Sequence, residues 1–376
     1  LRNRIVTLIY MRRPMKAAVC RLFGDPLVVE DLDLAAPQYG EVKVKMSAVA
    51  ICHSDVHIIR GEWAGEPPLV AGHEASGVVE AIGDGVTLVK PGDRVVVSLL
   101  RSCGRCICCT TGYPYQCEGT FALNTEHRMT DTSGNPVKMA IRTAAFAEET
   151  VVDQSQLAVV PDGFPMDVAS LLACGVITGF GAVVRTAKIT FGSSVVVLGV
   201  GGVGLNAIQG AVASGAYPII AVDLLDSKLE AAKRFGATHT VRADQDSAEE
   251  AVLEITGGRG ADYAFITVGS TAALEQGFKM IGKQGTEVLV GIPETGANFS
   301  LPAGGFAGSE KKMMGSMMGS TRLGYDIPKH VAAYQEGKLK LDELITNRYP
   351  LEKINEAIES MERGEALRNV ITFGEG

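Results

Sequence analysis

Residues 195–204 read Val-Val-Val-Leu-Gly-Val-Gly-Gly-Val-Gly, an apolar strand-like run that leads directly into a G-x-G-x-x-G string. A helical pattern follows as far as Ser214, and an acid, Asp223, ends the next apolar run 19 residues beyond Gly204. Strand, glycine turn and helix, with a carboxylate at that distance, predict a dinucleotide site. The glycines permit a tight turn and the approach of a pyrophosphate to the helix N-terminus. The predicted contacts in the turn are Gly199, Val200, Gly201, Gly202, Val203 and Gly204.

Asp223 indicates which dinucleotide binds. Its carboxylate would accept hydrogen bonds from the ribose hydroxyls and repel a 2′-phosphate, and Leu224 and Leu225 supply no cation to hold that phosphate. The sequence therefore predicts NAD rather than NADP. Lys228 either adds charge near the ribose or is an ordinary surface lysine. The alternative to a cofactor site is a glycine-rich structural turn in an unrelated α/β fold.

The flanking sequence differs on the two sides of residue 178. Beyond it, strand runs alternate with helical patterns such as 227–235, which ends at a helix-terminating Gly236. This alternation predicts a doubly wound parallel sheet. Before residue 160, short strands broken by Gly and Pro predict a β-rich, barrel-like domain. The predicted strands are 41–46, 77–82 and 94–97 in the first half, then 194–198, 219–223, 238–241, 263–268, 287–291 and 313–318.

Composition narrows the class of protein. The chain has 376 residues, 46% of them hydrophobic and 21% charged, which suits two globular domains and excludes a disordered chain. No apolar run approaches the roughly 18 residues that a membrane span needs. A net charge of −8 without a basic patch argues against nucleic-acid binding. Residues 1–14 are interpreted as an extension rather than a signal peptide, and we expect a cytoplasmic protein.

Five of the eight cysteines lie within 15 residues. Four of them have the spacing C-x2-C-x2-C-x7-C, and four thiolates close a tetrahedral shell of the kind that binds structural zinc. Disulfides are the alternative, which a reducing compartment disfavours. Cys108 is interpreted as a neighbour of the site, although an exchange with Cys109 stays open. The predicted ligands are Cys103, Cys106, Cys109 and Cys117.

Three further candidate ligands are scattered along the chain: Cys52, His73 and Cys174. Each alone has an ordinary explanation as a buried core residue. Together, two thiolates and one imidazole form a set that leaves the fourth position of a zinc ion open for a substrate, as in the catalytic zinc of alcohol dehydrogenase. Glu74 directly follows the histidine.

These motifs resemble the zinc-dependent alcohol dehydrogenases of the medium-chain dehydrogenase/reductase superfamily, from about residue 15 to residue 373. The resemblance rests on Cys-His-Ser-Asp-Val-His at 52–57, Gly-His-Glu at 72–74, the four-cysteine segment, Ala-Cys-Gly-Val-Ile-Thr-Gly at 173–179 and the glycine string. It implies that Cys52, His73 and Cys174 bind a catalytic zinc. Glu74 would approach the metal, and Asp55 would orient the imidazole of His73.

The resemblance also implies the remaining roles. Ser54 and His57 would form a proton relay between the alcohol and solvent. Further residues would contact the cofactor or line the substrate pocket. The cofactor contacts it implies are His53, Thr178, Val268, Ile292 and Arg368, in addition to Asp223 and Lys228; the pocket residues are Trp63 and Leu99, with Ile292 on the same wall.

The fold implied by the resemblance is α/β plus β: a GroES-like β-barrel catalytic domain with an inserted Rossmann domain. The expected boundaries are 15–177 and 320–376 for the catalytic domain, with a zinc lobe at about 100–120, and 178–319 for the NAD domain. Family members associate through an edge strand, here 313–318, which implies a homodimer or a homotetramer.

The expected activity is the NAD-dependent oxidation of primary or small secondary alcohols to aldehydes or ketones, and the reverse. Glutathione-dependent formaldehyde dehydrogenase and polyol dehydrogenase of the same superfamily are alternatives. Val56 and His57 depart from the formaldehyde subgroup, which usually has an acid and a residue other than histidine there. A zinc- and NAD(H)-binding sensor without turnover is a more distant alternative.

Overall fold

The alternating strands and helices of the second half form a six-stranded parallel sheet, as predicted from the sequence. The computed structural model describes residues 14–244 and 248–374, so the expected extension lies almost wholly outside the described residues. In spatial order the strands are β13 (His239–Arg242), β12 (Ile219–Asp223), β11 (Val195–Leu198), β14 (Ala261–Ile266), β15 (Ile281–Leu289) and β16 (Lys312–Gly315).

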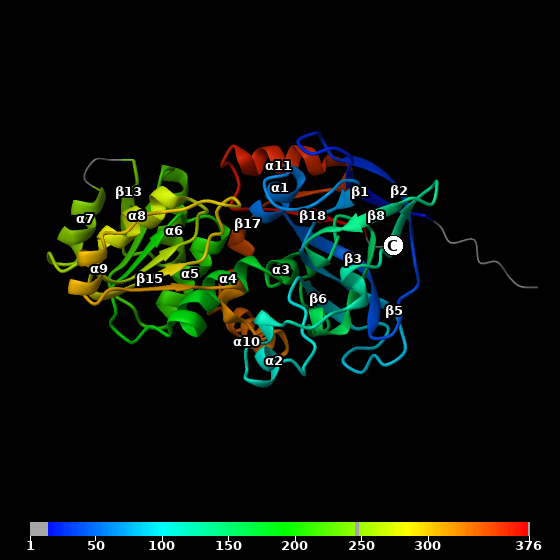
Figure 1. The fold of residues 1–376 in the computed structure, drawn as a ribbon, viewed down its shortest axis with the longest axis horizontal. Coiled ribbons are helices and arrows are strands. Elements are labelled where there is room, and N and C mark those ends of the chain that lie inside the picture. The colour runs from blue at the N-terminus through cyan, green and yellow to red at the C-terminus, as the bar shows by residue number, and fades with distance from the viewer. Residues whose placement is uncertain (1–13, 245–247, 375–376) are drawn as a thin grey trace, which may run out of the picture.

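Helices flank this sheet and complete the dinucleotide-binding domain, which fills the left side of Figure 1. Helix α6 ends at Gly236, whose φ of 111° is the left-handed conformation expected of a terminating glycine. The strand β11 is buried on both faces, which explains its unbroken run of apolar residues. The helices are α5 (Gly202–Ala213), α6 (Asp226–Phe235), α7 (Ala248–Ile255), α8 (Thr271–Met280) and α9 (Ala303–Gly308).

The first half forms the predicted β-rich domain, in two parts. One is a closed barrel of β1 (Met15–Cys20), β2 (Val28–Leu34), β7 (Met129–Asp131), β8 (Pro136–Met139) and β4 (Leu69–Val70). The other is a seven-stranded sheet in which β3 pairs with three neighbours. Its members are β10 (Leu157–Val159), β6 (Arg94–Ser98), β5 (Glu74–Ile82), β3 (Glu41–Ala50), β18 (Arg368–Thr372), β17 (Ile345–Tyr349) and β9 (Glu149–Asp153).

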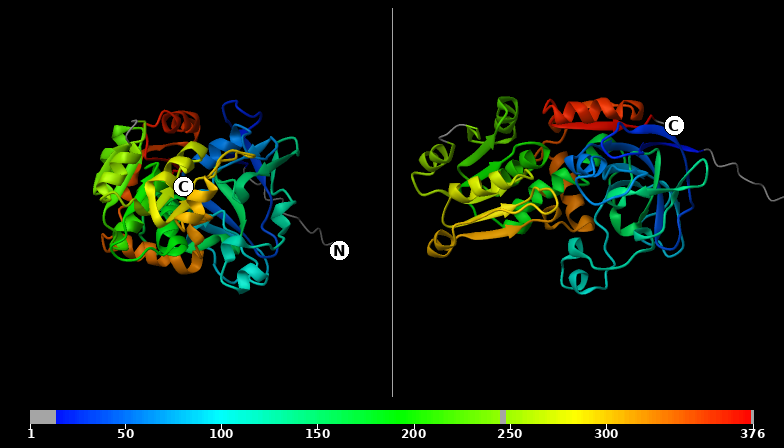
Figure 2. Two further views of the ribbon diagram at one scale, coloured as in Figure 1. Left: turned by 60° about the vertical axis from the view of Figure 1, so that its left-hand side comes forward. Right: turned by 45° about the horizontal axis from the view of Figure 1, so that its top comes forward.

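The C-terminal segment returns to this first domain. Strand β18 runs antiparallel to β3, with Ile371 opposite Val49. The right-hand view of Figure 2 shows the red C-terminal segment beside the blue N-terminal strands. The parallel-sheet domain is therefore an insertion, as expected. Within the described residues, no helix is long and apolar enough to cross a membrane.

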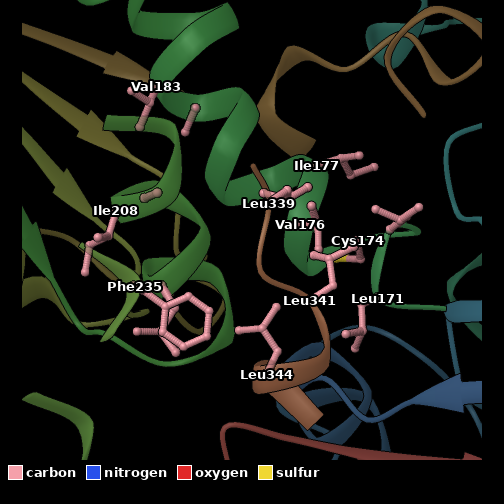
Figure 3. Packing of buried hydrophobic residues seen from close by; sticks show 14 of the residues in the cluster. Leu171, Cys174, Val176, Ile177, Val183, Ile208, Phe235, Leu339, Leu341 and Leu344 are labelled. Carbon is pink, nitrogen blue, oxygen red and sulfur yellow. The ribbon is translucent and has the colours of Figure 1, made fainter. Parts of the chain in front are cut away.

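A shared hydrophobic core joins the two domains. It includes residues of α3 (Met166–Leu171) and α4 (Gly175–Gly181), which connect the domains, and of the segment after α10 (Leu323–Gln335). Figure 3 shows Cys174 in this cluster together with Val176, Ile208 and Leu341. A predicted zinc ligand therefore lies where the two domains meet.

One buried group in the parallel sheet has no role in the predicted site. Glu287 on β15 is fully buried, and neither of its carboxylate oxygens has a hydrogen-bond partner among the described residues. Gly277 of α8 leaves room for it, because a Cβ there would come within 2.8 Å of a carboxylate oxygen. Burial raises the pKa of Glu287 to about 8, against the opposing attraction of Lys311.

Replacing Glu287 by glutamine should flatten the pH dependence of stability. Between pH 4.5 and about 8 the folded state keeps a proton that the unfolded state has released, so the free energy of unfolding falls as pH rises. Each pH unit in that window lowers the free energy of unfolding by up to about 1.4 kcal/mol. Urea unfolding of both proteins at each end of the window measures the effect. A difference between Glu287→Gln and the native chain that does not change with pH would contradict the prediction.

Candidate active site and metal centres

Four buried donor side chains meet at the junction of the two domains. Cys52, His73, Glu74 and Cys174 each offer a ligand atom, and these atoms all lie within 4.8 Å of one another. Cys52 precedes α1 (His53–Ile59), His73 directly precedes β5, which begins at Glu74, and Cys174 precedes α4. The structure thus brings together the three predicted ligands and the glutamate, although Cys174 lies 100 residues or more from the others in sequence.

The carboxylate of Asp55 orients the imidazole of His73. Its Nδ1 lies 2.9 Å from Oδ1 of Asp55, and the same carboxylate accepts hydrogen bonds from the backbone N–H groups of Gly72 and Cys52. Burial lowers the pKa of His73, but the charge and hydrogen bond of Asp55 outweigh it and raise the pKa well above its usual value. The Nε2 atom is buried without a partner among the described residues. A ring held in this way presents one nitrogen to a metal.

Arg368 adds a buried cation next to the cluster. Its guanidinium lies 3.0 Å from the carboxylate of Glu74 and donates to the backbone oxygen of Ile51 at 3.1 Å. Burial raises the pKa of Glu74 to about 8, although Arg368 opposes this. A Cβ added at Gly202 would lie 2.2 Å from Nε of Arg368, so the guanidinium occupies the space that a larger residue would need. Arg368 therefore links the ligand cluster to the glycine turn, where a pyrophosphate contact was predicted.

The pKa values of the two buried thiols shift in opposite directions. A hydrogen bond from Cys174 lowers the pKa of Cys52 well below its usual value and raises the pKa of Cys174. Two buried sulfur atoms, an imidazole nitrogen that has no hydrogen-bond partner among the described residues, and a carboxylate paired with Arg368 converge here. A divalent cation would satisfy these atoms together, and the donor set fits zinc.

The second cluster is the predicted four-cysteine site. The sulfur atoms of Cys103, Cys106, Cys109 and Cys117 all lie within 4.8 Å of one another, and no disulfide joins them. Helix α2 (Ile107–Thr110) lies inside this segment. The backbone N–H of Cys109 donates to the sulfur of Cys106 and lowers its pKa to about 6, which favours the thiolate that a metal binds. Cys108 is not part of the cluster, so the exchange with Cys109 left open by the sequence is not observed.

The glycine turn has the geometry that a pyrophosphate needs. Gly199 has a φ of 83°, which is accessible mainly to glycine. A Cβ at Gly204 would lie 2.0 Å from the backbone oxygen of Gly199, so only glycine allows α5 to begin this close to β11. Val200 donates its N–H to Asp223 at 2.7 Å, and Leu225 donates to the other oxygen at 3.0 Å. The predicted ribose carboxylate is therefore fixed beside the turn.

The cationic side chains near Asp223, Lys228 and Arg242, are bonded to other groups. Lys228 is buried and donates to the backbone oxygen of Ala366, so the interpretation as a surface lysine is wrong. Burial lowers its pKa. Arg242 lies beside Asp223 on the next strand, but it pairs with Asp244 at 2.7 Å and Asp226 at 3.2 Å.

The predicted relay residues lie on α1. Ser54 is half-buried, and His57, one turn later, is hydrogen-bonded to Glu62 and stacked on Trp63. His53, at the first position of the same helix, is exposed. The sequence analysis did not identify Glu62 as a functional residue, because its relation to His57 depends on the turn that follows the helix.

The residues predicted around nicotinamide and substrate separate into two groups. Thr178 lies 3.8 Å from the sulfur of Cys174, and both contact the thioether of Met318, a neighbour that no sequence motif indicated. Trp63 and Ile292 line one cleft, together with Pro293, Glu294 and Thr295. Leu99 is half-buried against the shared core and does not line this cleft. Val268 is exposed, and its side chain lies against Gly199.

A parallel sheet inserted into a β-rich domain, with one buried Cys/His/Glu cluster and one four-cysteine cluster that could each hold a metal ion, is typical of metal-dependent dehydrogenases. Comparisons with known proteins specify the family. Residues 38–162 match the alcohol dehydrogenase GroES-like domain, and residues 202–335 match the zinc-binding dehydrogenase domain. The chain belongs to the zinc-dependent alcohol dehydrogenase family of the medium-chain dehydrogenase/reductase superfamily.

The relatives cover nearly the whole chain. An NDMA-dependent alcohol dehydrogenase from Amycolatopsis methanolica is 40% identical over 95% of this chain and 98% of its own length. A benzyl alcohol dehydrogenase from Acinetobacter calcoaceticus is 33% identical, with a TM-score of 0.89 over 96% of this chain and 100% of that chain. A zinc-binding alcohol dehydrogenase domain protein from Burkholderia ambifaria is 32% identical, with a TM-score of 0.92 over the same shares. The chain is thus an alcohol dehydrogenase.

Proposed function

We propose that this enzyme oxidises primary or small secondary alcohols, with zinc bound by Cys52, His73 and Cys174 and with NAD as the hydride acceptor. The observation that carries the proposal is the unpartnered Nε2 of His73 between two buried cysteines, beside an arginine that reaches the glycine turn. A second zinc at the four-cysteine cluster would be structural, because four thiolates leave no open position.

The chain's own residues would handle the proton. When bound, zinc supplies Lewis acidity, which lowers the pKa of a coordinated water to about 7 and acts on an alcohol in the same sense. Ser54 would accept the proton of the alcohol, and His57 would pass it towards solvent, since its side chain is 29% exposed. The ligand residues are buried, and a closed site would keep water from the reacting carbon.

The choice of NAD rests on Asp223, which gives a testable prediction. The carboxylate lies beside the glycine turn, and the neighbouring cation Arg242 is paired with two acids. Asp223→Gly should therefore raise the ratio of kcat/KM for NADP to that for NAD by at least about tenfold, the equivalent of roughly 1.4 kcal/mol. Steady-state assays with both cofactors measure this ratio. An unchanged ratio would mean that another residue selects the cofactor.

One relative favours a second candidate acceptor. The Amycolatopsis methanolica enzyme is described as NDMA-dependent. Oxidation of benzyl alcohol, ethanol and butanol should be followed with added NAD alone, with NDMA alone and with both. The proposal expects turnover with NAD alone. Turnover only when NDMA is present would favour the second candidate.

We also propose a cytoplasmic homodimer, or a homotetramer, that contacts small alcohols and aldehydes but neither nucleic acid nor membranes. Strand β16 is the last strand of the parallel sheet, and no other strand of the described residues pairs with its outer edge. A second copy of the chain could therefore pair with this edge. Light scattering of the zinc-loaded chain measures its mass. A monomer at micromolar concentration would contradict this assembly.

A further inference from the structure

A tight turn brings two side chains back to His57. Helix α1 ends at Ile59, and Gly61 has a φ of 73°, which reverses the chain. The N–H groups of Glu62 and Trp63 then both donate to the backbone oxygen of His57, at 2.9 and 3.3 Å. The backbone thus fixes the positions of these two residues relative to the helix before their side chains make any contact.

The two side chains hold the imidazole on different sides. A carboxylate oxygen of Glu62 is hydrogen-bonded to Nδ1 of His57. The indole of Trp63 stacks on the ring, with centroids 5.0 Å apart and an angle of 23° between the planes. Trp63 also lines the cleft that it shares with Ile292. The imidazole is therefore held against a residue that lines the cleft, with its orientation fixed by two neighbours.

The bond to Glu62 determines which nitrogen carries the proton. A carboxylate accepts and cannot donate, so Nδ1 must carry the hydrogen of this bond. In the neutral ring Nε2 is then the acceptor. A histidine that receives a proton from a hydroxyl needs an acceptor nitrogen, and the tautomer selected by Glu62 provides one.

We propose that Glu62 is a positioning residue for the relay: it holds His57 in the Nδ1–H tautomer, so that Nε2 accepts the proton released by the alcohol. The proton then leaves from His57 to solvent, and the imidazole returns to its starting state. This inference rests on the proposed function, because it assigns Glu62 a role only if His57 carries protons.

A merely structural role for Glu62 would have different consequences. As part of the turn after α1, it would stabilise the protein whether or not His57 were present. The two roles therefore differ in how the effects of Glu62→Ala and His57→Ala combine. If Glu62 acts through His57, the two losses of activity are not additive.

The kinetic test uses the zinc-loaded enzyme and five variants, among them His57→Ala and its combination with Glu62→Ala. Glu62→Ala should lower kcat by about 10- to 100-fold, the range observed for residues that orient another catalytic group, with little change in KM. Glu62→Gln should keep most of the activity, because its amide oxygen can accept the same bond. Glu62→Ala should cause no further loss in a His57→Ala background. Glu66→Ala is the matched control, since this nearby glutamate pairs with Lys138 instead.

A spectroscopic test identifies the tautomer of His57 independently of enzyme activity. The chain has six histidines, so nitrogen-15 spectra of histidine-labelled, zinc-loaded protein are simple enough to assign, with His57→Ala identifying the signals. The native His57 should show a protonated Nδ1 and an unprotonated Nε2. Glu62→Ala should shift the populations towards the other tautomer, and Glu66→Ala should not.

The outcomes separate this inference from the proposed function. Equal losses from Glu62→Ala with and without His57, or an unchanged tautomer in Glu62→Ala, would overturn the role of Glu62 alone. Full activity of His57→Ala would overturn the relay and the role of Glu62 with it. Absence of alcohol oxidation with any acceptor in the native enzyme would overturn the proposed function, whereas the tautomer measurement would still report on the bond.

Discussion

Replacing Cys174 by alanine should remove one metal ion per chain and lower alcohol oxidation by at least about 10³-fold. Zinc supplies several kcal/mol of stabilisation to the transition state, and each 1.4 kcal/mol or so is a factor of ten in rate. The sulfur of Cys174 belongs to a buried cluster in which every ligand atom lies within 4.8 Å of the others. With this sulfur absent, Cys52 and His73 are left as two of the three predicted ligands.

The measurement combines metal analysis with turnover and cofactor binding. Native protein should contain about two zinc ions per chain, and Cys174→Ala about one. Binding of NAD should survive, because the glycine turn does not depend on this sulfur. Cys20→Ala is the matched control: this cysteine is also buried, but it lies outside both clusters. Retained turnover in Cys174→Ala would remove Cys174 from the ligand set.

Local patterns predicted most of the fold. Every predicted strand of the parallel sheet is observed, with ends that shift by a few residues; strand 287–291, for example, belongs to the longer β15. Helix α10 begins at Leu323, where the carboxylate of Asp326 accepts the backbone N–H of Arg322 and stabilises the first turn. Such a bond within four residues is not visible in hydrophobic periodicity.

The candidate site was predicted unevenly. The four-cysteine cluster has a local spacing, so its members could be read from the sequence. Cys52, His73 and Cys174 have no mutual spacing, and only the family resemblance connected them. The contact between Met318 and Cys174 spans 144 residues. It depends on three successive left-handed residues, Met318, Gly319 and Ser320. A Cβ at Gly319 would lie 2.0 Å from the backbone oxygen of Ile177, so this close packing against α4 has no simple sequence signal.

The second large effect is expected at the four-cysteine cluster, where Cys109→Ala should release one metal ion per chain and unfold the segment around α2. Binding of structural zinc contributes about 10–16 kcal/mol in small peptides, and this free energy is coupled to folding. The segment has few other sources of stability, since none of the residues of α2 is buried. Its fold therefore depends mainly on the metal.

Limited digestion with trypsin tests this expectation directly, because Arg105 lies between two of the cysteines and is exposed. In the native chain the metal-bound backbone should resist cleavage, since a protease needs an extended, mobile segment. Cys109→Ala should be cut after Arg105 at a much higher rate and should contain about one zinc ion per chain. Cys108→Ala is a closely matched control, because the adjacent cysteine lies on the same short helix but outside the cluster. Equal cleavage of the two variants would show that the segment is held by its loops rather than by a metal.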